Sequence, residues 1–123
     1  MQKSREDYLE TILILSKRLP ELHAVDIANE LKYAKPSITR ALNILKASGY
    51  LKIDNNNHIK LTKKGLIKAE AIYERHQFIT KFWLLNGISP EAAERDACLI
   101  EHDISAETFA FIKTFVLARE KDK

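Results

Sequence analysis

One short stretch of this chain alternates apolar and polar residues, whereas the sequence on both sides of it has helical spacing. Residues 51–53 and 58–61 alternate around the polar segment 54–57, which predicts a small β-hairpin. Elsewhere apolar residues recur three and four positions apart, as in amphipathic helices. The chain has only three glycines and three prolines, so few tight turns are available. A mainly α fold with one hairpin is therefore predicted.

The segment before the hairpin predicts three helices. An apolar stripe indicates a first helix over residues 4–18, and Pro20 closes it. A short helix follows from about residue 25, and the next begins at Pro36 and ends at Gly49. Two short helices joined by a tight turn and followed by a hairpin have the element order of a winged helix-turn-helix.

The remainder predicts a helical region that forms a dimer. Thr62 is the expected N-cap of a long helix over 63–86, a second helix runs from Pro90 to about Ile104, and a third covers 106–120. The last helix is apolar on two sides, so we expect a partner subunit to cover the second side. The predicted domains are a DNA-binding domain over 1–64 and a metal-binding and dimerisation domain over 65–123.

Positive charge is concentrated where the helix-turn-helix and hairpin are expected. Residues 23–64 carry eight Lys or Arg against three Asp or Glu, although the whole chain has a net charge of only +3. A solvated basic face is the alternative to a DNA-binding surface. In a winged helix-turn-helix, the second helix enters the major groove by its N-terminal residues, and the hairpin contacts the backbone or minor groove. The predicted DNA-binding residues are Lys35, Pro36, Ser37, Thr39, Arg40 and Lys60.

Potential metal ligands recur in three of the predicted helices. Cys98-x-x-Glu101-His102 and Asp7-x-x-Glu10 each place their side chains on one helix face, and His76 interrupts an apolar stripe. Taken singly, Cys98 fits a small buried hydrophobe and His76 fits a core histidine. Their combination favours a metal site, which Glu94, one turn before Cys98, is also positioned to join.

These motifs together resemble the diphtheria toxin repressor and manganese transport regulator family over about residues 4–118. The resemblance implies a homodimeric, metal-activated transcriptional repressor with an N-terminal DNA-binding lobe. The motifs are Asp7-Tyr8-Leu9-Glu10, the helix entry over 34–40, Leu61-Thr62-x-x-Gly65, His76 and Cys98-x-x-Glu101-His102.

The resemblance also implies a ligand set and a choice of metal. Its DNA contacts fall on Pro36, Ser37, Thr39 and Arg40. Asp7 and the short ending are typical of the manganese branch, whereas Cys98 is typical of the iron branch. We therefore expect Fe²⁺ or Mn²⁺, with Zn²⁺ and Co²⁺ also fitting in vitro. The implied metal ligands are Asp7, Glu10, His76, Cys98, Glu101 and His102.

The predicted function is a metal-dependent regulator that represses metal-uptake genes, with the metal bridging the two lobes. The alternative is a metal-independent winged-helix regulator in which Cys98 senses oxidants. A small metal-dependent hydrolase ranks below both, because no nucleophile and base pair accompanies the ligands. We expect no enzyme activity, no small-molecule substrate and no membrane partner. Without an apolar run of about 18 residues or a signal segment, the expected location is the cytoplasm.

Overall fold

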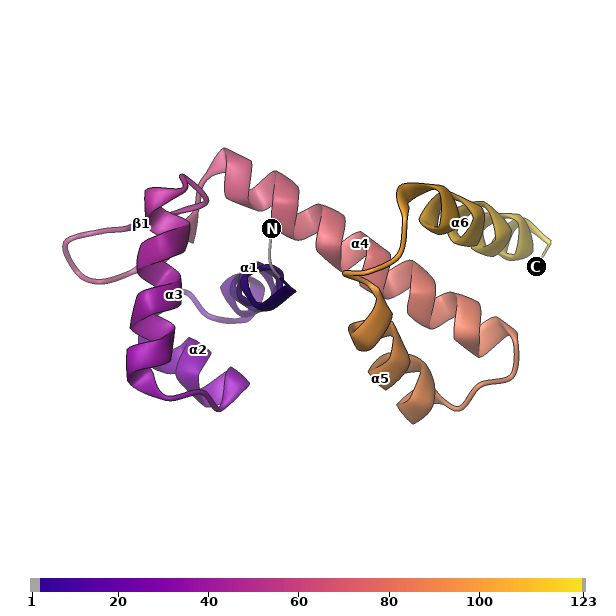
Figure 1. The fold of residues 1–123 in the computed structure, drawn as a ribbon, viewed down its shortest axis with the longest axis horizontal. Coiled ribbons are helices and arrows are strands. Elements are labelled where there is room, and N and C mark those ends of the chain that lie inside the picture. Colours follow the sequence, from indigo (N-terminus) through magenta and orange to yellow (C-terminus); the bar gives the residue numbers. More distant parts are fainter. Residues whose placement is uncertain (1–2, 123) are drawn as a thin grey trace. The chain divides into compact units, whose positions relative to one another are not determined.

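The computed structural model describes residues 3–122 and divides into two compact units, residues 1–70 and 71–123. Met1, Gln2 and Lys123, which the predicted domain bounds include, lie outside the described residues. The predicted domain boundary after residue 64 stays a prediction. Among residues 3–122, no helix is long and apolar enough to cross a membrane. Figure 1 shows the elements in order: α1 (Lys3–Arg18), α2 (Ala24–Leu31), α3 (Lys35–Ala47), β1 (Leu51–Ile53), β2 (Ile59–Leu61), α4 (Lys63–Leu85), α5 (Pro90–Ile100) and α6 (Ala106–Lys121).

Helices α2 and α3 form the helix-turn-helix of the first unit. The backbone N–H of His23 donates to the Asp26 carboxylate at 2.9 Å and so satisfies a donor at the start of α2. Helix α2 ends at Leu31, and its C-cap residue Lys32 is left-handed with φ 58°. Pro36 lies in the first turn of α3, where no intrahelical hydrogen bond needs its missing N–H. The helices are those that the sequence predicts.

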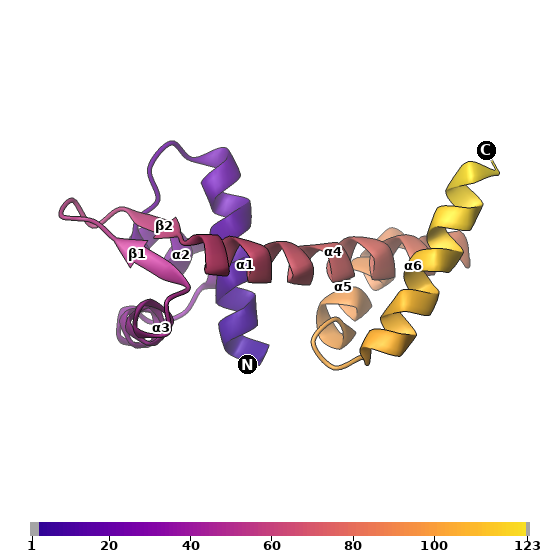
Figure 2. The same ribbon diagram turned by 90° about the horizontal axis from the view of Figure 1, so that it is seen from above.

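The hairpin completes the winged helix-turn-helix. Strands β1 and β2 form the wing (Figure 2). They are antiparallel, and Lys52 pairs with Lys60 in a register that also pairs Leu51 with Leu61. Leu51 and Ile59 are buried while Lys52 and Lys60 are exposed, as strand alternation requires. The mainly α fold with a β-hairpin wing is confirmed.

The wing joins α4 through a close backbone approach at Gly65. Thr62 caps α4, as predicted: its hydroxyl accepts from the Gly65 N–H at 3.1 Å and donates to the Gly49 carbonyl at 2.6 Å. A Cβ atom at Gly65 would lie 1.8 Å from the carbonyl oxygen of Tyr50. Only glycine fits where α4 leaves the wing.

The second unit packs residues 71–85 of α4 together with α5 and α6. Its core contains Ile79, Ala97, Ile112 and Val116, with Trp83 partly buried against them. On α6, Phe111 remains 65% exposed and Leu117 41% exposed. The second apolar side of α6 is thus left uncovered within the described chain.

Helix α5 ends earlier than the sequence predicts. We expected it to continue to about Ile104, but it ends at Ile100, and a turn follows. Arg75 of α4 donates to the carbonyl oxygens of Glu101 at 3.3 Å and Ile104 at 2.9 Å. These carbonyls therefore have a side-chain donor in place of further helical partners. Glu101 keeps helical dihedral angles as the C-cap, and His102 lies in the turn.

Replacing Gly65 with alanine should destabilise the first unit by about 3 kcal/mol, because the new methyl group meets fixed backbone. The control is Gly49→Ala, where φ is +83° but the nearest atom is a flexible lysine carbon at 4.0 Å. That strain should cost about 1–2 kcal/mol. Urea unfolding followed by circular dichroism measures both, and equal losses would contradict the steric explanation.

Candidate metal centre and nucleic-acid interface

His76 is the centre of a cluster of potential metal ligands in the second unit. Its Nδ1 lies 2.7 Å from Oε2 of Glu101, and its Nε2 lies 2.8 Å from Oε1 of Glu94. The sulfur of Cys98 is 3.8 Å from the same Nδ1. Helix α4 supplies His76, α5 supplies Glu94 and Cys98, and Glu101 caps α5. Two helices, α4 and α5 with its C-cap residue, thus bring carboxylate, thiol and imidazole groups together.

Glu101 is buried, with an exposed fraction of only 2%. Its Oε1 lies 3.2 Å from Nε2 of His102, yet accepts no hydrogen bond from the described residues. A buried carboxylate oxygen is costly without a hydrogen bond or a cation. This oxygen fits a metal ligand.

The surroundings of His76 favour its protonated form. The Cys98 sulfur first, and then the carboxylate of Glu101, raise the pKa of His76 to about 11, against a smaller opposing effect of burial. Because a protonated imidazole carries an N–H on each nitrogen, it donates to Glu101 through Nδ1 and to Glu94 through Nε2. A metal that used either nitrogen would have to displace a proton.

The donor atoms suit a divalent transition metal. One ligand atom from each of His76, Glu94 and Cys98 lies within 4.8 Å of the other two. Imidazole, carboxylate and thiolate are ligands of Fe²⁺, Co²⁺ and Zn²⁺, while carboxylates also suit Mn²⁺. The residues present therefore fit the predicted metal.

The structure distributes the six predicted ligands over both units. Asp7 and Glu10 lie one turn apart on α1 of the first unit, each partly exposed. The other predicted ligands belong to the second unit, where Glu101 contacts both histidines. The sequence left open whether Glu94 is a ligand, and the spacing of one helical turn between Glu94 and Cys98 was the only signal for it. In the structure Glu94 contacts His76. Assignment of the complete set to one metal stays a prediction.

The predicted DNA-binding residues are exposed on α3 and the wing. Ile38, Leu42 and Leu45 face the core of the first unit, so the other face of α3 is free for contact. Exposed residues on these elements are Lys35, Pro36, Ser37, Thr39, Arg40, Lys52 and Lys60.

One lysine near this surface stabilises the fold instead. Lys64 donates to the carbonyl oxygen of Ser48, at the end of α3, at 2.8 Å. Its ammonium also lies 4.4 Å from the ring centre of Tyr50. The charge of Lys64 is therefore engaged with a helix C-terminus, where a cation is favourable.

Two family models together match almost the whole chain. Residues 1–59 match the model described as the iron dependent repressor N-terminal DNA binding domain. Residues 62–123 match the model described as the iron dependent repressor metal binding and dimerisation domain.

Curated relatives and solved structures agree with these matches. The chain is 34% identical over 110 residues to the transcriptional regulator MntR of Escherichia coli, covering 89% of this chain and 71% of that protein. It is 31% identical over 126 residues to an uncharacterised helix-turn-helix regulator of Methanocaldococcus jannaschii, covering 100% of this chain and 99% of that protein. The structure of the manganese regulator SloR superimposes with a TM-score of 0.78 at 26% identity, covering 91% of this chain and 53% of SloR. The chain thus spans about half the length of that solved regulator.

The raised pKa of His76 predicts a pH-dependent stability in the metal-free chain. Its contribution is fully present below the ordinary value of 6.5 and is lost as the pH rises towards about 11. At pH 6, His76→Gln should cost about 2 kcal/mol, the worth of charge-assisted hydrogen bonds. Thermal melts in chelator from pH 6 to 10 should show the two proteins converging. A difference that stays constant over this range would contradict the assigned charge state.

Proposed function

The chain belongs to the iron-dependent repressor family, and we propose that it represses metal-uptake genes when Fe²⁺ or Mn²⁺ is bound. The observation that carries this proposal is the ligand cluster around the buried Glu101, in a chain whose first unit is a winged helix-turn-helix. DNA binding then belongs to the first unit, while the second unit supplies most of the proposed metal ligands.

The proposed ligands are Asp7, Glu10, His76, Cys98, Glu101 and His102. The contacts among His76, Cys98 and Glu101 support the part of the set in the second unit. Asp7 and Glu10 join it on the strength of their helical spacing and the family resemblance. Glu94 contacts His76 and is a further candidate. A bound divalent cation supplies the positive charge that these carboxylates and the thiolate share.

The proposed DNA contacts are the exposed residues at the start of α3, together with Lys60 of the wing. Arg40 is long enough to donate two hydrogen bonds to a guanine, which is how arginine commonly reads a base. The uncovered apolar side of α6, including Phe111 and Leu117, supports a dimer contact in this region. A twofold dimer presents two copies of α3 to two half-sites.

In this proposal metal binding and DNA binding are coupled, because the metal takes ligands from both units. With Asp7 and Glu10 held to the ligands of the second unit, the separation of the two recognition helices in the dimer becomes fixed. Half-sites on DNA recur about every 34 Å, so a fixed separation favours binding to an operator. A coupling of about 1–3 kcal/mol corresponds to a 5- to 150-fold gain in affinity. DNA must then tighten metal binding by the same factor.

The proposal assigns no catalytic role to the cluster, since family members are transcriptional regulators. It places the protein in the cytoplasm. Cys98 favours Fe²⁺ over Mn²⁺ because thiolates prefer softer metals, whereas the carboxylates accept both.

The central experiment compares DNA affinity with Mn²⁺, with Fe²⁺ and with chelator in anaerobic buffer. The probe is a duplex selected from random sequences in the presence of Mn²⁺, and binding is followed by fluorescence anisotropy. At least one metal should tighten binding about 5- to 150-fold. Glu101→Gln should lose this gain, because it removes the buried negative charge, while Glu91→Gln on the exposed first turn of α5 should keep it.

Equal affinity in all three buffers would overturn the proposal. If an oxidant changed the affinity and the chelator did not, the alternative with Cys98 as a redox sensor would replace it. Cys98 is exposed, so an oxidant has access to it.

A second experiment separates base reading from backbone contact. Arg40→Ala should cost about 1–3 kcal/mol of DNA affinity and relax the preference at one base pair per half-site. Lys60→Ala should weaken binding to all sequences alike and reduce the dependence on salt concentration. Competition with single-base operator variants measures the first effect, and a salt titration measures the second. If both variants behaved alike, Arg40 would not read a base.

A further inference from the structure

A second cluster of potential metal ligands lies in the first unit and shares no residue with the predicted ligand set. Glu21 and His23 belong to the loop between α1 and α2, and His58 belongs to the wing just before β2. One ligand atom from each lies within 4.8 Å of the other two. None of these three side chains belongs to the metal-ligand set or the DNA-contact set proposed above.

One backbone hydrogen bond brings the three residues together. The N–H of Ile59 donates to the carbonyl oxygen of Leu22 at 2.8 Å and joins the wing to the loop before α2. Leu22 and Ile59 are both buried, each only 3% exposed. Since Glu21 and His23 flank Leu22, and His58 precedes Ile59, this fixed pairing sets their side chains opposite each other.

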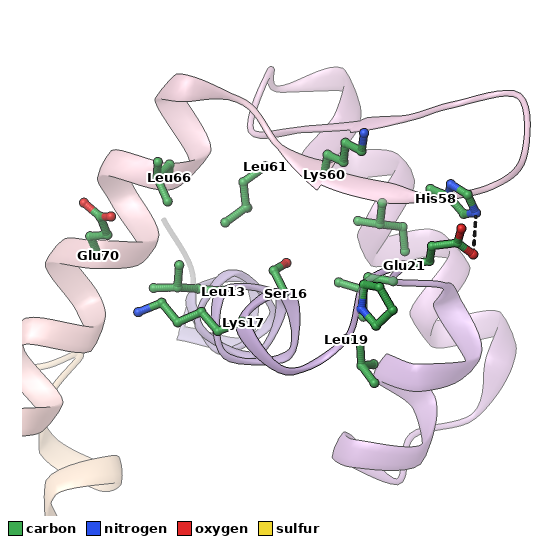
Figure 3. Close-up of a pocket in the computed structure, with 13 residues that line it drawn as sticks. Leu13, Ser16, Lys17, Leu19, Glu21, His58, Lys60, Leu61, Leu66 and Glu70 are labelled. Carbon is green, nitrogen blue, oxygen red and sulfur yellow. Dashed lines mark ion pairs between the residues drawn. The ribbon is translucent and has the colours of Figure 1, made fainter.

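His58 is oriented from both sides of its ring. Its Nε2 lies 3.3 Å from Oε2 of Glu21, and a dashed line in Figure 3 marks this ion pair. Its Nδ1 lies 3.3 Å from Oδ2 of Asp54. The other oxygen of Asp54 accepts from the backbone N–H of Asn56 and His58, which fixes this carboxylate in the turn. Asp54 thus holds one ring nitrogen while the other faces Glu21.

A second imidazole completes the arrangement. The rings of His23 and His58 meet edge to face with centroids 4.8 Å apart. The backbone N–H of His23 is held by Asp26, so the residue has a fixed position at the start of α2. Glu21 and His58 also line a cavity of about 590 Å³ beside the loop, which gives water and ions access.

We propose that Glu21, His23 and His58 form a binding site for a divalent transition metal of the Zn²⁺ class, with Asp54 orienting His58. Two imidazoles and one carboxylate are a known ligand set of Zn²⁺, which then keeps one coordination position for water. A carboxylate that accepts from the second nitrogen of a ligand histidine is the common outer contact at such sites. The bound metal ties the wing to the loop before α2. This site stands independently of the proposed regulatory function.

The test follows the four histidines of the full chain by long-range ¹H–¹⁵N NMR during titration with Zn²⁺. His23 and His58 should shift in a saturable manner with one Zn²⁺ per chain, separately from any response of His76 and His102. The amide of Ile59 should also exchange more slowly with solvent once Zn²⁺ is bound. These readouts use the unmodified chain and need no variant to fold.

Variants then test the assigned ligands by competition with a chromophoric chelator. Glu21→Gln should weaken Zn²⁺ at this site at least tenfold, and Asp54→Asn, which keeps an oxygen for the turn, should weaken it about 10- to 100-fold. The matched control is Glu70→Gln, because Glu70 lines the same cavity but is outside the ligand cluster. It should leave the affinity unchanged.

The proposal is wrong if Zn²⁺ shifts only His76 and His102, or if the shifts of His23 and His58 do not saturate. It is also wrong if Glu21→Gln and Glu70→Gln weaken binding equally, since surface charge would then explain the binding. The DNA experiments can fail while this site binds metal, and the reverse also holds, so the two proposals are tested separately.

Discussion

The carboxylate of Glu101 is buried, and a buried charge must be compensated by charge or hydrogen bonds. In the second unit this requirement is met by His76, whose ring donates to Glu101 at 2.7 Å. Arg75, one residue earlier on α4, binds the backbone carbonyl of Glu101 and so ends α5 where the carboxylate faces the imidazole. The same two neighbouring residues of α4 therefore determine where α5 ends and how the Glu101 carboxylate is oriented. A metal at this cluster would exchange a proton for a cation at a place already organised for positive charge.

The first unit uses a different principle, in which backbone contacts position exposed side chains. The approach of Gly65 to Tyr50 fixes where α4 leaves the wing. The hydrogen bond from Ile59 to Leu22 fixes the wing against the loop before α2. Because backbone contacts hold this unit together, the residues on the outer face of α3 remain exposed and accessible to a partner. The same fixed backbone gathers Glu21, His23 and His58 without any of them being part of the core.

Much of the fold follows from the sequence, but contacts between distant residues do not. The hairpin was evident from its alternation, the cap at Thr62 from its position, and the helix-turn-helix from element order. The end of α5 was placed too late, because the stop comes from Arg75, more than 25 residues away in sequence. The ligands in the second unit were recognisable from helical spacing, but the contact between Glu94 and His76 required two helices to pack together. The contact of Lys64 with Ser48 also has no local signal, because the two residues lie 16 positions apart in the sequence.

The sequence alone determined the order and type of the elements and the chemistry of the candidate ligands. Periodicity and caps act over a few residues, so they can be read locally. Only the tertiary structure decided which ionisable groups face each other: His76 with Glu101, and His58 with Glu21 and Asp54. Two of these pairs join residues more than 20 positions apart, and such contacts form only when buried neighbours lock distant segments together. For that reason the cluster at His23 and His58 has no signature in the sequence, although each of its residues is plainly visible there.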